Sequence, residues 1–177
     1  IYLDHIAATP LAPGVLEAML PYLGERFGNP QSLHADGQAV AEAVAQGADL
    51  VKTLVAKSDV VIENFPPRVL PSYGLDYAHL RAVKPDIIMI SMPAAGQYGP
   101  LRDIITYGPT LSGLAGMTSL LGYPDPQGAQ VCAETGYADP MAAAAGTFYV
   151  LAALRYRDLT GEGQLIDMAQ WETLTSL

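Results

Sequence analysis

Apolar residues in the first part of the chain recur at helical spacing. Thr9-Pro10 and Ala12-Pro13 are typical of a helix start, because proline fits the first turn of a helix. The apolar positions that share one helical face are Val15, Leu16, Met19, Tyr22 and Leu23. Gly28-Asn29-Pro30 is a turn signal, so the pattern predicts that this helix ends there.

A second helical pattern begins near Asp36 and continues to Gln46. Gly47 is a weak point in it, because glycine lowers helix stability. The apolar stripe then resumes at Leu50, Val51, Leu54 and Val55. We expect a boundary here between an N-terminal segment, residues 1–46, and a second domain, residues 47–177.

Beyond residue 58 the pattern becomes that of strands alternating with a helix. Asp59–Glu63 and Asp86–Met92 are continuous apolar runs, typical of parallel strands buried on both faces. Tyr77–Lys84, between them, is predicted to be a short helix. The expected fold class is therefore α/β, a partial doubly wound, Rossmann-like parallel sheet preceded by a helical N-terminal segment.

Ligands of open α/β sheets bind beyond the carboxyl ends of the strands. In this chain that edge would carry the residues after the two predicted strands, which are Asn64, Phe65, Arg68 and the loop Pro93–Arg102. These residues are candidates for ligand contact. The alternative is that they form ordinary loops, because most loop residues carry no site.

The last third of the chain contains its clearest helix signal. Asp139-Pro140 would start this helix, because aspartate is a favoured N-cap and proline a favoured first helical residue. An Ala-rich run to Arg157 follows, and Thr160–Gly163 forms the closing turn. The other elements expected here are a helix or helix pair at Gly108–Leu121, a strand at Gly163–Met168 and a helix at Ala169–Leu177.

Asp139 is the residue of greatest chemical interest. Exposed N–H groups and the helix dipole favour the charged form of a carboxylate at a helix N-terminus, so it stays available as a nucleophile. Aspartate at this position can equally serve only as an N-cap. The residues alone leave both roles open.

Charge narrows the range of partners. The chain has 18 Asp and Glu against 9 Lys and Arg, a formal net charge of −9. Because proteins that follow phosphates or anionic lipids need surplus basic residues, neither nucleic acid nor a membrane surface is expected as a partner. The longest apolar stretch, Met141–Leu154, is too short and too rich in Ala and Gly for a membrane span.

Cysteine and histidine are too sparse for a disulfide framework or a metal site. A single cysteine, Cys132, excludes an internal disulfide and is consistent with a reducing compartment. His5, His34 and His79 are dispersed, so we expect no metal centre. With no signal peptide visible at the acidic start, we expect a cytoplasmic protein.

The second domain resembles the family III CoA-transferases. The segments that carry the resemblance follow the family's order and spacing, and they are Ser58–Phe65, Tyr73–Tyr77, Gly96–Pro100 with Arg102-Asp103, Tyr107–Thr118 and Thr160–Gln164. Several ordered signatures are far more specific than one short motif. In that family the nucleophilic aspartate lies just before an Ala-rich helix, in a stretch like Ala138–Ala143, so the resemblance assigns this role to Asp139.

The resemblance also implies substrates and a mechanism. CoA would move from an acyl-CoA to a small carboxylic acid through an aspartyl anhydride and an aspartyl-CoA thioester, with no permanently bound cofactor and a homodimer as the complete protein. Asn64, Phe65 and Arg68 resemble the CoA-contacting region. The related α-methylacyl-CoA racemases use a histidine where this chain has Tyr107–Pro109, which favours a transferase.

The N-terminal segment resembles a different family, the PLP-dependent cysteine desulfurases. Ile1–Pro10, Val15–Tyr22 and Phe27–His34 carry this resemblance, which stops near Gln46. That family's phosphate-binding loop, Schiff-base lysine and catalytic cysteine have no matching motif, so PLP binding is not expected. Three hypotheses follow, namely a CoA-transferase, a desulfurase-related protein and a noncatalytic chimeric fragment that self-associates through exposed apolar strand edges.

Overall fold

The structure is a computed structural model and describes residues 14–26, 28–30, 35–120 and 137–176. The chain divides into two compact units, residues 1–49 and residues 50–177. Each unit is considered by itself. Among the described helices, none is both long enough and apolar enough to cross a bilayer.

The first described helix is shorter than its sequence pattern predicts. α1 (Val15–Leu23) is followed directly by Gly24. The prediction that it ends at Gly28–Pro30 is therefore wrong, because the helix ends at the first glycine that follows its apolar stripe, and glycine favours helix ends. The predicted start at Thr9–Pro13 lies outside the described residues.

α2 (Ala35–Val55) is one continuous helix of 21 residues. Gly47 lies inside it and does not interrupt it, because an interior glycine costs only about 1 kcal/mol relative to alanine and the neighbouring residues favour helix. The division between the two units falls within this helix, after Asp49. Assignment of residues 1–46 and 47–177 to separate domains stays a prediction.

The second unit is built on a three-stranded parallel sheet. Its strands are β1 (Val60–Glu63), β2 (Ile88–Ser91) and β3 (Leu165–Asp167), in the order β1-β2-β3. In the register, Val60 pairs with Ile88 and Met89 pairs with Leu165. All three strands were predicted, each within a few residues of its observed bounds.

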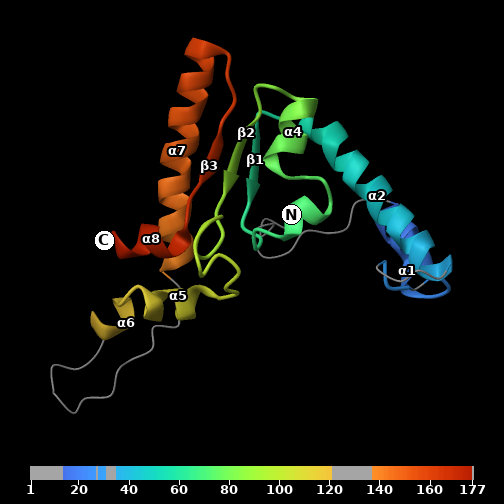
Figure 1. The fold of residues 1–177 in the computed structure, drawn as a ribbon, viewed down its shortest axis with the longest axis horizontal. Coiled ribbons are helices and arrows are strands. Elements are labelled where there is room, and N and C mark those ends of the chain that lie inside the picture. The colour runs from blue at the N-terminus through green and yellow to red at the C-terminus, as the bar shows by residue number, and fades with distance from the viewer. Residues whose placement is uncertain (1–13, 27, 31–34, 121–136, 177) are drawn as a thin grey trace, which may run out of the picture. The chain divides into compact units, whose positions relative to one another are not determined.

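Helices cover both faces of this sheet, with α4 (Tyr77–Val83) and α7 (Ala138–Thr160) on opposite sides of the strands (Figure 1). Met89 points to the α4 face, where it joins Leu80 in one apolar cluster. Ile90 points to α7, which approaches closely at Gly146: a Cβ there would come within 3.2 Å of Ile90 Cδ1. The central strand is therefore fully buried, and the α/β class with a helical N-terminal part is confirmed.

Four shorter helices complete the described residues of this unit. They are α3 (Val69–Ser72), α5 (Gly108–Leu114), α6 (Met117–Leu120) and α8 (Gln170–Thr175). Of the two alternatives for Gly108–Leu121, the helix pair is the observed one. α3 was not predicted, because a single turn with a central proline has no periodicity to detect.

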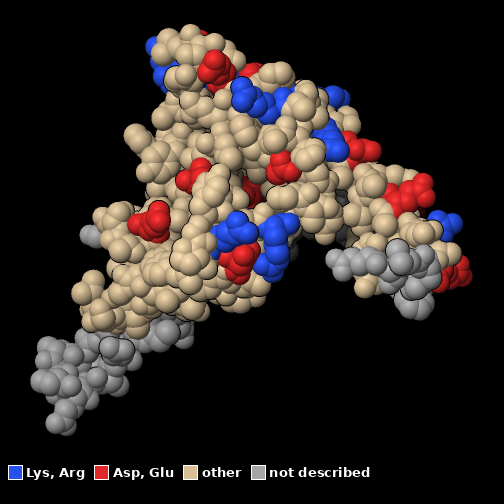
Figure 2. All heavy atoms as spheres, viewed as in Figure 1, with Lys and Arg blue, Asp and Glu red and all other residues tan. Residues whose placement is uncertain are grey.

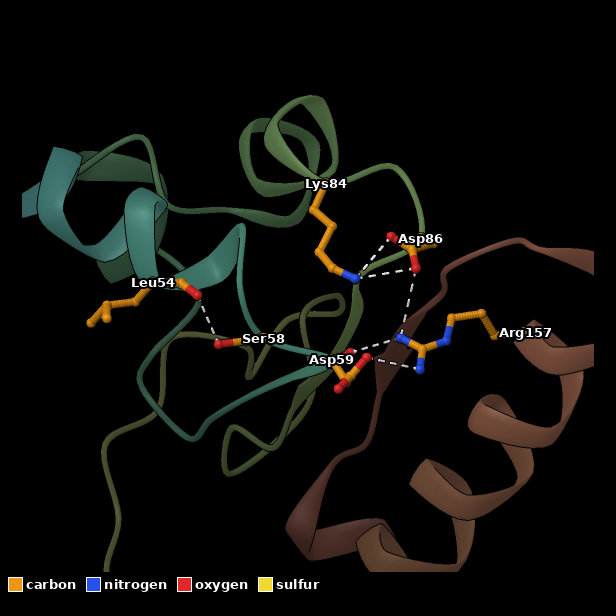
Figure 3. A network of polar contacts seen from close by, with 6 residues as sticks. All are labelled: Leu54, Ser58, Asp59, Lys84, Asp86 and Arg157. Carbon is orange, nitrogen blue, oxygen red and sulfur yellow. Dashed lines mark hydrogen bonds and ion pairs between the residues drawn. The ribbon is translucent and has the colours of Figure 1, made fainter.

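Polar contacts fix the far end of α7 to the amino ends of the strands (Figure 3). Arg157 Nη2 lies 3.0 Å from Asp59 Oδ1, and its Nη1 lies 3.9 Å from Asp86 Oδ2. Lys84 Nζ also donates to Asp86, at 3.0 Å. Since Asp59 precedes β1 and Asp86 precedes β2, one guanidinium holds α7 against both strands. These contacts leave the opposite, carboxyl edge of the sheet free of α7's last turns.

Candidate active site

A cleft of about 270 Å³ lies at the carboxyl edge of the sheet. It is lined by residues that follow each of the three strands, by the start of α5 and by the first turn of α7. These residues are Asn64, Pro66, Ala94, Ile104, Ile105, Thr106, Tyr107, Gly108, Leu111, Asp139 and Gln170. The place agrees with the rule that open parallel sheets bind ligands beyond their strand ends. The cleft's volume is slightly smaller than the roughly 300–1,000 Å³ of typical ligand pockets.

Asp139 is not the N-cap of α7, and that prediction is wrong. The helix begins at Ala138, its N-cap is Tyr137, and no side chain caps it. The reason is packing: Ala138 is buried against Leu111 of α5 and Leu174 of α8, which draws two more residues, Ala138 and Asp139, into the helix. Asp139 is therefore the second helical residue, exposed and facing the cleft. The capping role that competed with a nucleophilic role is removed, while the carboxyl group stays within the first helical turn, where the dipole favours negative charge.

Gln170 is a cleft residue that sequence reasoning missed. Its side chain is buried and its Nε2 donates to the Met92 carbonyl oxygen at 2.8 Å. Its backbone N–H donates to the Pro93 carbonyl oxygen at 3.1 Å. Gln170 thereby holds the chain after β2 beside the chain after β3. The strand-end rule, applied to the third predicted strand as well as to the first two, would have found it.

Thr106 is a second missed residue. Among the buried side-chain atoms of the described residues, its Oγ1 is the one that has no hydrogen-bond partner. Buried hydroxyls are nearly always paired, so an unpaired one requires an explanation, such as a bound water or ion or a catalytic role. Thr106 lines the same cleft as Asp139. No sequence pattern distinguishes such a threonine, because its lack of a partner arises from tertiary packing.

Of the predicted ligand contacts, the structure brings Asn64 and, from the loop Pro93–Arg102, Ala94 into the cleft with Asp139. The Phe65 side chain is 49% exposed and is not part of the lining. Arg68 lies outside it as well, with Nη1 3.8 Å from Asp103 Oδ1, and Arg102 Nε lies 3.4 Å from the same carboxyl group. Figure 2 shows charged side chains scattered over the face it draws, with basic and acidic groups gathered around the chain that follows β2.

Within the described ranges, no three His, Cys, Asp or Glu side chains are grouped as a metal ion would require. The cleft itself offers the following side chains. It has one exposed carboxyl group in a helical first turn, side-chain amides from Asn64 and Gln170, and the unpaired Thr106 hydroxyl.

The second unit is similar in sequence to curated CoA-transferases. The succinyl-CoA–D-citramalate CoA-transferase of Chloroflexus aurantiacus is 35% identical over 132 residues, which are 75% of this chain and 32% of that protein. The succinate–glutarate CoA-transferase of Agrobacterium fabrum is 40% identical over 124 residues, 70% of this chain and 30% of that protein. This chain thus spans about a third of the length of these relatives.

Solved structures give the same result for the fold. A CAIB/BAIF family protein from Brucella suis superposes with a TM-score of 0.70 at 36% sequence identity, covering 75% of this chain and 34% of that one. Its similarity extends the sequence likeness to the arrangement of the sheet and its helices.

A different match is shorter. Cysteine desulfurase IscS of Dictyoglomus turgidum is 44% identical over 63 residues, which are 35% of this chain and 16% of that protein. By contrast, residues 40–177 match the sequence profile of CoA-transferase family III, which covers well over half of the chain. With the fold, the strand-edge cleft and this match in agreement, the chain belongs to CoA-transferase family III.

Proposed function

We propose that this chain carries the nucleophile of a CoA-transferase, which moves CoA from an acyl-CoA to a carboxylic acid through a covalent intermediate on Asp139. The observation that carries the proposal is the placement of Asp139 and Asn64 in one cleft at the carboxyl edge of the sheet. An exposed carboxyl group in the first turn of a long helix can attack a thioester and form a covalent intermediate.

The proposed reaction has four balanced steps. An Asp139 carboxylate oxygen attacks the thioester carbonyl and the C–S bond breaks. CoA leaves as a thiolate, and the acyl group is now joined to Asp139 as a mixed anhydride. The thiolate attacks the aspartyl carbonyl, which releases the first carboxylic acid and leaves an aspartyl-CoA thioester. An acceptor carboxylate then displaces the thiolate to form a second anhydride. Attack of the thiolate on the acceptor acyl carbonyl frees Asp139 and the new acyl-CoA. Covalent catalysis divides one difficult transfer into easier steps.

We propose that CoA extends from the cleft to residues outside it. The cleft of about 270 Å³ accommodates the thioester end and the acyl group. Asn64 lies where the cleft meets the turn after β1, and Phe65 and Arg68 follow it along an exposed surface. An exposed aromatic ring and an arginine suit the base and the phosphates of a nucleotide. Site assignments for Asn64, Phe65 and Arg68 rest on this placement and on the family resemblance.

The donor we propose is a short dicarboxylic acyl-CoA. Names of several relatives include succinyl-CoA or succinate as one reactant. We also propose that the complete protein is a cytoplasmic homodimer and that acyl-CoA and a small carboxylic acid are its partners, with no permanently bound cofactor. The present chain spans only about a third of the length of its relatives, so the support for these proposals comes from the family resemblance.

Intact-protein mass spectrometry tests the nucleophile. After incubation with succinyl-CoA, the wild-type chain is expected to gain the mass of CoA less one water, which is the aspartyl-CoA thioester. Asp139→Asn is expected to gain nothing. Asp158→Asn is the matched control, because this exposed carboxyl group lies near the other end of the same helix. A folded wild-type chain without any adduct, or an adduct retained in Asp139→Asn, would overturn the proposal.

A desulfurase-related protein is the alternative favoured by the 63-residue match to IscS. It predicts a visible absorbance band after incubation with PLP. Borohydride reduction would then attach the PLP covalently to a lysine. A CoA adduct on Asp139 without such a band supports the transferase. A chain that shows neither is the noncatalytic fragment of the third hypothesis.

A further inference from the structure

Glu63, the last residue of β1, is a buried carboxyl group beside the proposed CoA site. Its side chain is only 8% exposed, although glutamate is almost never buried unless it has a partner. Both of its oxygens accept hydrogen bonds. Oε2 accepts from the Phe65 backbone N–H at 2.7 Å, and Oε1 accepts from the Ser91 hydroxyl. Glu63 therefore contacts the turn that carries Asn64 and also the end of the neighbouring strand.

These contacts continue across the whole carboxyl edge. Ser91, the last residue of β2, is fully buried, and its Oγ accepts from Gln97 Nε2 at 2.5 Å. The Gln97 backbone N–H donates to Asp167 Oδ1 at 3.1 Å, and Asp167 is the last residue of β3. One chain of hydrogen bonds thus joins the final residues of all three strands to the two loops that leave β1 and β2.

This network is costly if its only purpose is to stabilise the sheet. In the described part of the chain, the ion pairs do not include Glu63, so neutral donors alone compensate its burial. Burying a carboxyl group without a cation is unfavourable relative to an apolar side chain of the same volume. The neighbouring positions Ile88 and Ile90 show that this sheet accepts apolar residues readily. What an apolar residue at position 63 would lack is an acceptor for the Phe65 N–H.

We propose that Glu63 is a positioning residue of the CoA site, which acts through the Phe65 backbone and through Ser91. By accepting the Phe65 N–H it fixes the turn at residues 63–65, and so it sets the direction in which Asn64 faces the cleft and Phe65 faces outward. Through Ser91 and Gln97 it fixes the loop after β2 in the same register. This inference rests on the proposed function, because it assigns a role in binding CoA.

Two substitutions separate the acceptor from the bulk of Glu63. Glu63→Gln keeps an oxygen for the Phe65 N–H and places an amide toward Ser91 Oγ, whereas Glu63→Met keeps the volume and has no oxygen. Glu162→Gln is the control, because Glu162 lies exposed in the turn after α7. The single tryptophan, Trp171, packs against the apolar cluster that contains Leu111, which lines the cleft, so its fluorescence serves as the probe for binding there.

The first readout is hydrogen exchange of the Phe65 amide, which needs no ligand. We expect slow exchange in wild type, Glu63→Gln and Glu162→Gln, and exchange about tenfold faster in Glu63→Met, as loss of one buried hydrogen bond implies. The second readout is CoA affinity from Trp171 fluorescence. It is expected to be unchanged in Glu63→Gln and Glu162→Gln and about tenfold weaker in Glu63→Met. Circular dichroism and a urea transition confirm that each variant is folded.

The outcomes distinguish the two proposals. Unchanged Phe65 exchange in a folded Glu63→Met, or equal CoA affinity in all four proteins, overturns the positioning role and leaves the transferase proposal intact. A wild-type titration that does not saturate overturns both. For the case that Glu63→Met does not fold, Ser91→Ala removes the donor that holds the Glu63 carboxyl group, and the same two changes are expected at smaller size. Their absence there overturns the inference.

Discussion

Asp76 caps α4 with its side chain. Its Oδ1 accepts from the backbone N–H of Ala78 at 3.0 Å and of His79 at 3.3 Å, and its Oδ2 lies 2.6 Å from His79 Nδ1. Burial by itself raises the pKa of Asp76. Hydrogen bonds from His79 and from the Ala78 backbone N–H, together with the charge of His79, lower it by more, so the pKa lies below its usual 3.8. Asp76 therefore favours the folded state more when it is ionised.

The sign of this pKa shift gives a prediction for stability against pH. Because the folded-state pKa is lowered, the contribution of the charge is present above about pH 4 and is lost as the pH falls through the folded-state pKa. Asp76→Asn keeps the cap without the charge. We expect wild type to be slightly more stable than Asp76→Asn in urea at pH 6, and the difference to decrease as the pH falls through the folded-state pKa. A difference that grows on acidification would contradict the account. The effect is small, because the site is mostly exposed and screened by solvent.

Residue roles at the cleft could be predicted only in part. Asp139 and Asn64 were predicted as candidates because a helix-start signal and a strand end are visible in the sequence, and both line the cleft. Thr106 was missed because its lack of a partner arises from tertiary packing, and Gln170 because the strand-end rule was applied only to the first two strands. Glu63 belongs to the turn that resembles the CoA-contacting region, but its burial and its contact with Ser91 cannot be seen in the sequence. Asp139 was itself assigned to the wrong helical position, because the burial of Ala138 in a cluster from three helices decides where α7 begins.

At the scale of the secondary-structure elements, alanine substitutions at two glycines are expected to have opposite effects on stability. A Cβ at Gly163 would lie 2.2 Å from the Ile87 carbonyl oxygen, whereas a Cβ at Gly47 would meet nothing within 4 Å. We expect Gly163→Ala to reduce the free energy of unfolding by about 2 kcal/mol or more, since backbone must move to admit the methyl group. Gly47→Ala is expected to stabilise α2 by about 0.5–1 kcal/mol. Urea unfolding followed by circular dichroism measures both. Equal effects of the two substitutions would contradict the close contact between Gly163 and the backbone at Ile87.

Elements were predicted well where one physical signal was dominant. The strands were found because parallel strands buried on both faces have continuous apolar runs, as in Asp86–Met92. Helix ends were less certain, since α1 ends at Gly24 while α2 continues through Gly47. Both are glycines in helical patterns. Whether a glycine ends a helix depends on the residues that follow it. Helix-forming residues follow Gly47, whereas the turn-forming segment Gly28-Asn29-Pro30 comes soon after Gly24.

At the scale of the molecule, large apolar side chains remain exposed on the second unit. Phe148 and Leu159 of α7 are each 68% exposed, and Ile62 of the edge strand β1 is 64% exposed. Figure 2 likewise shows broad areas of uncharged side chains on the face it draws. Exposed apolar patches and open strand edges favour association.

We therefore expect the chain to self-associate as its concentration rises, which size-exclusion chromatography with light scattering would show. Phe148→Glu is expected to reduce the association. Thr147→Glu is the matched control, because it adds the same charge at the adjacent exposed position and removes no large apolar side chain. A chain that stays monomeric throughout, or a control that disperses it equally well, would contradict this expectation.

The central claim is that Asp139 forms a covalent bond to the transferred group. The most direct measurement is incubation with succinyl-CoA in the presence of hydroxylamine, followed by tandem mass spectrometry of the peptide that contains Asp139. Hydroxylamine attacks an aspartyl anhydride or thioester and leaves a hydroxamate on the carboxyl group that carried it. We expect a hydroxamate on Asp139 that forms only when succinyl-CoA is present. Its absence from the folded chain, or its presence on a different carboxyl group, would contradict the account.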